Sequence, residues 1–149
     1  MEHNEELTIE GVKALLGFRS TIGSVKEALP PARSLLMASF LEANKIDVAG
    51  TKLTTGARAL SKHVHRCSSG WWGNFSGNDE TKNELALNNI AYLIQHACWL
   101  NVYHMPSNLV VFEIRVEEGY GARWSADGTK FRGFLEPQMM DGHAKRWKH

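Results

Sequence analysis

Apolar residues recur every three to four positions through the first two thirds of the chain, which is the spacing of one face of a helix. These stripes predict helices over Ile9 to Leu16, Leu35 to Asn44, Thr55 to Arg66 and Asp79 to Met105. The Pro30-Pro31 pair either breaks a helix that Ser24 and Glu27 would open as a capping box or restarts one with proline in its first turn. Thr54 or Thr55 is expected to cap the third helix, and Pro106 to end the last.

After Pro106 the period of the pattern falls to two, which is typical of strands. Turns at Glu118-Gly119 and Asp127-Gly128 divide this region into a predicted three-stranded antiparallel meander. One face of that sheet is expected to be apolar: Val110, Phe112, Ile114, Val116, Ala122, Trp124, Phe131 and Leu135. The other is expected to be charged: Glu113, Arg115, Arg123, Arg132 and Glu136.

The pattern as a whole predicts an α+β fold in which about four helices pack on one face of a small antiparallel β-meander. Apolar residues make up 43% of the 149 positions, enough for a hydrophobic core without disulfides or a structural metal. No repeat or linker interrupts the chain, so we expect one globular domain over residues 1–149. The tail from Pro137 to His149 shows no clear period.

Charge and cysteine usage narrow the class of protein. Seventeen basic and sixteen acidic residues argue against a protein that binds nucleic acid or membrane with its whole surface. Cys67 and Cys98 have neither disulfide-framework nor zinc-site spacing, and the acidic N-terminus lacks a secretory signal. The longest apolar stretch, Ile90 to Tyr103, is too short and polar to span a bilayer. We therefore expect a cytoplasmic protein with no membrane contact, cofactor or metal.

The charge is nevertheless uneven along the chain. No acidic residue lies between Asp47 and Asp79, whereas four basic residues do. On a helix, Arg58, Lys62, His65 and Arg66 share one face, and a glycine-rich loop with Trp71, Trp72 and Phe75 follows. Cations beside aromatic rings suit the phosphates and bases of a nucleotide or single strand. The alternative is a solvated basic face with both tryptophans packed on the core.

His63 and His65 are candidates for acid–base catalysis, because an unperturbed histidine titrates near neutral pH. On a strand the pair would share a face and could hold one metal ion. On the predicted helix the side chains diverge by about 200°, which argues against a metal site.

The charged sheet face is the second candidate. Glu113 and Glu136 would form a carboxylate pair in a cleft, one of them orienting a histidine or acting as a second base, with Arg115, Arg123 and Arg132 as anion clamps. The alternative is a solubilising ladder of cross-strand ion pairs. The tail, with His143 and Trp147, would either fold over this face and complete the site or remain a disordered basic terminus.

The segment GYGARWSADGTKFRGFLEPQMMDGHAKRWKH, Gly119 to His149, resembles the C-terminal signature of a family of small uncharacterised proteins. ALSKHVHRCSSGWWG, Ala59 to Gly73, is similar to the central segment of the same family. The resemblance implies that the basic segment and the tail belong to one module.

Together these features predict a protein that binds a phosphorylated ligand, either a nucleotide or a nucleic-acid end. If the protein is an enzyme, the features predict a hydrolase or phosphoryl transferase that uses histidine acid–base chemistry. One alternative is a non-catalytic module for single-stranded nucleic acid that uses the same basic face. Another is a protein-interaction module with Trp71, Trp72 and Phe75 as anchors.

Overall fold

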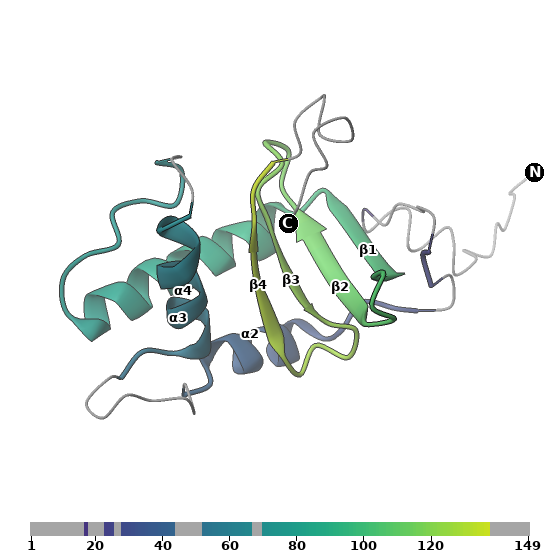
Figure 1. Ribbon diagram of the computed structural model, residues 1–149, viewed down its shortest axis with the longest axis horizontal. Helices are drawn as coiled ribbons and strands as arrows, with labels where there is room; N and C mark the ends of the chain where they lie inside the picture. The colour runs from purple at the N-terminus through teal and green to yellow at the C-terminus, as the bar shows by residue number, and fades with distance from the viewer. Residues whose placement is uncertain (1–16, 18–22, 26–27, 44–51, 67–69, 138–149) are drawn as a thin grey trace, which may run out of the picture.

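The computed structural model describes residue 17 and residues 23–25, 28–43, 52–66 and 70–137 (Figure 1). The described elements run in the order α2 (Arg33–Leu41), α3 (Thr55–Val64), α4 (Asp79–His96), β1 (Trp99–His104), β2 (Val110–Arg115), β3 (Gly121–Ser125) and β4 (Phe131–Leu135). The helix expected from Ile9 to Leu16 lies outside these residues, as does the tail after Pro137.

The strands form one antiparallel sheet in the order β1-β2-β3-β4, and α2, α3 and α4 gather on one side of it (Figure 1). This confirms the α+β class. The described residues contain three helices rather than about four, and one strand more than the meander predicted. None of the described helices is long and apolar enough to cross a membrane.

The additional strand corrects the prediction of one helix from Asp79 to Met105. The helix α4 ends at His96, and residues 99–104 pair with β2 as strand β1. Aromatic and β-branched residues such as Trp99, Val102 and Tyr103 favour a strand, and the backbone groups of β1 bond to those of β2. Tertiary pairing therefore wins over the helical spacing of the apolar residues.

The start of the described chain also differs from the capping-box prediction. Ser24 forms an antiparallel bridge with Tyr103 of β1 instead of opening a helix. A helix does restart after the Pro30-Pro31 pair, but both prolines lie ahead of its N-cap Ala32 rather than in its first turn, and α2 ends at Leu41.

Side-chain caps stabilise the N-terminal ends of α3 and α4. The Thr54 side chain accepts a hydrogen bond from the backbone N–H of Ala57 at 3.1 Å, so the predicted cap is confirmed. Asn78 caps α4 in the same way by accepting from the backbone N–H of Thr81 at 2.9 Å. Asp79 and Glu80 in the first turn of α4 further stabilise that end, since carboxylates favour the positive end of the helix dipole.

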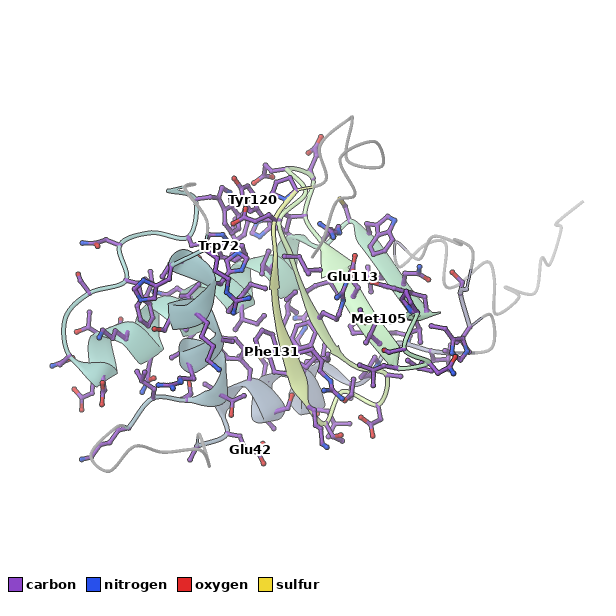
Figure 2. All side chains as sticks on the ribbon, in the orientation of Figure 1. Glu42, Trp72, Met105, Glu113, Tyr120 and Phe131 are labelled. Carbon is purple, nitrogen blue, oxygen red and sulfur yellow. The ribbon has the colours of Figure 1, made fainter. Side chains whose placement is uncertain are left out.

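The core lies between the sheet and the helices (Figure 2). Phe40 of α2 meets Phe131 of β4 edge-to-face, with ring centroids 4.9 Å apart. Trp124 is fully buried, and its indole N–H donates to the main-chain oxygen of Leu36 at 3.1 Å. A Cβ atom at Gly56 would lie 2.1 Å from the Phe40 ring, so only glycine lets α3 approach α2 this closely.

A β-bulge in strand β4 inverts the alternation expected near its end. Arg123 pairs with Gly133 while Trp124 pairs with Phe131, which leaves Arg132 as an extra residue. Phe134, rather than Leu135 as predicted, therefore faces the helices, where its ring lies 5.9 Å from that of Phe40. The predicted place of Glu136 on the charged sheet face is wrong for the same reason.

Candidate functional site

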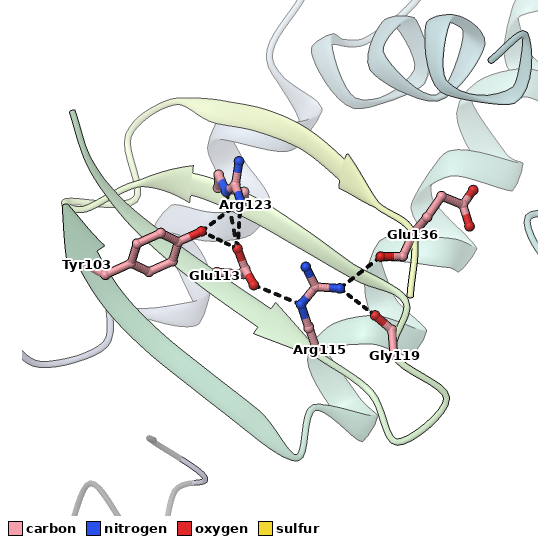
Figure 3. Close-up of polar contacts among 6 residues, drawn as sticks. All are labelled: Tyr103, Glu113, Arg115, Gly119, Arg123 and Glu136. Atoms are coloured by element: carbon pink, nitrogen blue, oxygen red, sulfur yellow. Dashed lines mark hydrogen bonds and ion pairs between the residues drawn. The ribbon is translucent and has the colours of Figure 1, made fainter. Parts of the chain in front are cut away.

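The charged sheet face brings together four side chains, which we call the sheet-face cluster: Tyr103, Glu113, Arg115 and Arg123 (Figure 3). Arg115 Nε donates to Glu113 Oε2 at 2.8 Å, and Arg123 Nη2 donates to Glu113 Oε1 at 2.8 Å. The Tyr103 hydroxyl donates to Glu113 Oε1 at 2.5 Å and accepts from Arg123 Nη2 at 2.7 Å.

Strand register explains why these residues meet. Glu113 lies directly opposite Arg123 on β3 and Asn101 on β1, and it alternates along β2 with the core residues Phe112 and Ile114. The predicted phase of β2 and β3 is therefore correct. The helical spacing that extends to Met105 hides Tyr103 as a member of this face, although the two-residue spacing of Asn101 and Tyr103 carries the signal.

Three members of the sheet-face cluster are nearly inaccessible to solvent, and the fourth, Tyr103, is partly buried. Glu113 is 2% exposed, and Arg115 and Arg123 are each 8% exposed. One carboxylate faces two guanidinium groups, so the cluster carries an excess of positive charge. No buried side-chain nitrogen or oxygen in the described residues lacks a hydrogen-bond partner. Buried ion pairs give little net stability against an apolar replacement, which makes such a cluster a candidate for function.

Electrostatics keep both acidic groups of the cluster in defined protonation states. Burial acts to raise the pKa of Glu113, but the charge of Arg115 and the hydrogen bonds from Tyr103 and Arg123 outweigh it, so that pKa falls below its ordinary value of 4.5. Burial, and after it the negative charge of Glu113, raises the pKa of Tyr103 well above its ordinary 10.0. At neutral pH the carboxylate is ionised and the phenol keeps its proton.

Arg115 extends the cluster to the end of the sheet. Its Nη1 donates to the main-chain oxygen of Gly119 at 2.7 Å and to that of Glu136 at 3.0 Å. The Glu136 side chain, however, turns away from the carboxylate of Glu113, as Figure 3 shows. The expected pair of Glu113 and Glu136 in one cleft is therefore absent, because the bulge at Arg132 places the two carboxylates on opposite faces.

A second cluster joins α3 to the end of β4. His63 Nε2 lies 2.9 Å from Glu136 Oε1, and the indole N–H of Trp72 donates to the same oxygen at 2.9 Å. The ring of His63 meets that of Trp72 edge-to-face at 5.0 Å. The side chains of His63 and Glu136 are 17% and 23% exposed, so solvent reaches this pair more easily than the sheet-face cluster.

The other basic residues predicted for α3 point elsewhere. Lys62, His65 and Arg66 are exposed and Arg58 is partly buried. Helix α3 ends at Val64, so His65 and Arg66 lie just beyond it. His63 and His65 diverge, and no group of three or more histidine, cysteine, aspartate or glutamate side chains in the described residues could hold a metal ion.

The loop tryptophans pack against the protein, as the alternative interpretation expects for Trp72. That residue is 1% exposed, and its main-chain oxygen accepts from Asn89 of α4 at 2.9 Å. Trp71 is partly buried and stacks on Tyr120 at a centroid distance of 4.2 Å. Tyr120 was not predicted as part of this arrangement. Of the remaining candidates, Arg132 is exposed at the bulge, and His143 lies outside the described residues.

Fold and geometry define a small α+β domain with an arginine–glutamate–tyrosine cluster on the face of its sheet opposite α2, α3 and α4. Residues 42–136 match the model of a family described as the CdiA C-terminal tRNase toxin domain. The match spans more than half of the chain, and the protein belongs to this family. This match corrects the expected resemblance to a family of uncharacterised proteins, because the matched family is described as a tRNase toxin domain.

A solved structure has a similar fold. It is the toxic C-terminal tip of CdiA from Pseudomonas aeruginosa in complex with an immune protein, with a TM-score of 0.54 and 24% sequence identity. The similarity covers 66% of this chain and 99% of that one. A search among curated proteins finds no match.

Proposed function

We propose that this domain is a ribonuclease that cleaves tRNA and is toxic to the cell whose tRNA it cuts. The observation that carries the proposal is the family match over residues 42–136, which include α3, α4 and all four strands. The sheet-face cluster supports it independently, because its residue types suit chemistry at a phosphodiester.

RNA supplies its own nucleophile for this reaction. The 2′ oxygen attacks the adjacent phosphorus, the P–O5′ bond breaks, and a 2′,3′-cyclic phosphate and a 5′-hydroxyl end form. The 2′-hydroxyl must lose a proton, the 5′ oxygen must gain one, and negative charge builds on the phosphoryl oxygens between these events. An enzyme that accelerates this step needs a base, a proton source for the 5′ oxygen and fixed positive charge.

The sheet-face cluster supplies the base and the positive charge, and the 5′ oxygen takes its proton from water. Glu113 is the proposed base, since its carboxylate is ionised at neutral pH and held by three neighbours. Arg115 and Arg123 are proposed to bind the phosphoryl oxygens, and Tyr103, whose hydroxyl proton is donated to Glu113, to hold the carboxylate in place. Each arginine side chain keeps about a tenth of its surface exposed, so the phosphate approaches at the rim of the cluster.

A second candidate for proton transfer is His63. Its contact with Glu136 at 2.9 Å favours this role, because a carboxylate that accepts from one ring nitrogen fixes the orientation of a histidine and leaves the other nitrogen for a substrate. No guanidinium group contacts His63 among the described residues, whereas two contact Glu113. We therefore place the main site on the sheet face.

The proposal has consequences for partners and location. An enzyme that cleaves tRNA acts where tRNA is, in the cytoplasm. The similar CdiA tip is bound to an immune protein. We propose that a protein partner also binds this domain and inhibits it, while the substrate is the nucleic acid.

The test is direct. The purified protein is incubated with total tRNA, and the products are separated on a denaturing gel and their ends identified by mass spectrometry. We expect discrete fragments with cyclic phosphate and 5′-hydroxyl ends. Intact tRNA after long incubation at excess enzyme would refute the function, and fragments with 5′-phosphate ends would refute the chemistry assigned to Glu113.

A further inference from the structure

The exposed basic residues at the C-terminal end of α3 are not used by the proposed chemistry. No acidic residue occurs between Asp47 and Asp79, so the sequence gives the end of α3 no carboxylate from its own neighbourhood. Lys62, His65 and Arg66 are exposed and form no ion pair with another described residue. This basic end of α3, defined by these three residues, is a local surplus of positive charge on a chain whose formal net charge is +1.

His63 and Glu136 link helix α3 to the sheet-face cluster. His63, next to Lys62 in the chain, contacts the carboxylate of Glu136, and the main-chain oxygen of Glu136 accepts from Arg115. Figure 1 shows α3 packed beside β4, the edge strand of the sheet. A strand of RNA that left the sheet-face cluster around this edge would run toward α3.

Stabilisation of the α3 helix accounts for only some of the basic residues at its C-terminal end. Cations in the last turn of a helix offset its dipole, and Lys62 and His63 occupy that turn. Arg66 lies beyond the helix, where its backbone N–H donates to the main-chain oxygen of His63. Its side chain is exposed to solvent. An exposed guanidinium in an acid-free stretch is suited to phosphate, which it binds in a bidentate fashion.

We propose that the basic end of α3 binds the tRNA backbone at phosphates away from the bond that is cut. The inference rests on the proposed function and deepens it: the preferred substrate is an RNA long enough to reach both places, not a short oligonucleotide. Contacts of this kind carry no sequence information and raise affinity in a salt-dependent way.

The experiment compares two substrates and two double variants. The substrates are a full tRNA and a short oligoribonucleotide that contains only the cleaved sequence. One variant, Lys62→Ala with Arg66→Ala, removes charge from the basic end of α3. The matched control, Arg33→Ala with Lys130→Ala, removes the same charge from two other exposed positions. Thermal melts confirm that both variants are folded.

We expect the first variant to lower the ratio of kcat/KM on tRNA to that on the oligoribonucleotide about tenfold or more, through KM. The slope of log(kcat/KM) on tRNA against log[salt] should become shallower by about 2, since roughly one unit is lost for each phosphate contact. The control should keep the wild-type ratio. An unchanged ratio in the first variant, or an equal fall in the control, overturns the proposal.

Failure of the ribonuclease function is distinguishable from failure of this inference. If the wild-type protein cleaves no RNA, binding to tRNA is measured by gel shift with the same variants. Weaker tRNA binding only in Lys62→Ala with Arg66→Ala then supports the basic end of α3 as a binding site for RNA. Equal binding by all three proteins refutes it.

Discussion

The guanidinium group of Arg115 donates to the main-chain oxygen of Glu136 at 3.0 Å. This hydrogen bond links the buried cluster on one face of the sheet to Glu136, whose carboxylate contacts His63 on the other face. The same side chain holds Glu113 through Nε at 2.8 Å. Arg115 thus fixes both the proposed base and the end of the edge strand.

The hydrogen bonds that Arg115 makes to three residues lead to a prediction about stability. Lysine keeps the charge but has a single nitrogen, which cannot serve Glu113, Gly119 and Glu136 together. Arg115→Lys should lower the free energy of unfolding by about 2–4 kcal/mol, as expected when hydrogen bonds to buried charged groups are lost. Urea unfolding measures it, with Arg132→Lys, at an exposed position, as the control. Equal stability of the two variants would contradict the role given to Arg115.

Glu113 predicts a pH dependence of stability. Its pKa is lower in the folded state than the ordinary 4.5, so its stabilising effect is complete above about pH 4.5 and is lost as the pH falls through the folded value. Glu113→Gln should be less stable than the wild type by about 3–5 kcal/mol at pH 7, because two buried arginines lose their carboxylate. The difference in unfolding free energy should shrink below pH 4.5. A difference that stays constant from pH 7 to pH 3 would show that Glu113 is not held by its arginines.

Gly56 tests the packing of α3 against α2. An added methyl group would lie 2.1 Å from the Phe40 ring, so Gly56→Ala should destabilise the fold by about 1–3 kcal/mol despite the better helix propensity of alanine. Gly70→Ala is the control, since nothing lies within 4 Å of a Cβ atom there. A stabilised Gly56→Ala protein would mean that the two helices are further apart than described. Differential scanning calorimetry gives both values.

Sequence patterns predicted the parts of the sheet in which alternation is regular. Glu113, Arg115 and Arg123 lie on one face because β2 and β3 keep a strict period of two. The bulge at Arg132 broke that rule for Glu136, and a bulge depends on local backbone geometry that residue types do not specify. Tyr103 was missed because the segment from Trp99 to His104 has apolar spacing compatible with a helix as well as a strand, and pairing with β2 decides between them.

The interpretation of the histidines depended on a contact that only the fold supplies. The helical period of α3 correctly separates His63 from His65, since His63 is half-buried beside Trp72 and His65 is exposed. Which carboxylate would meet His63 could not be predicted, because Glu136 reaches it across 73 positions of sequence.

The most direct test is single-turnover cleavage of one tRNA by the wild type, Glu113→Gln and His63→Gln, each shown to be folded under the assay conditions. Arg123→Lys serves as a second variant of the sheet-face cluster if Glu113→Gln fails to fold. Loss of a general base slows such a step by about 10²- to 10⁴-fold. We predict a loss of that size for Glu113→Gln, a loss of about 10²- to 10³-fold for Arg123→Lys because a donor to the phosphoryl oxygens is weakened, and less than about tenfold for His63→Gln. Full activity of the sheet-face variant together with a large loss in His63→Gln would contradict the proposed site and move the chemistry to α3.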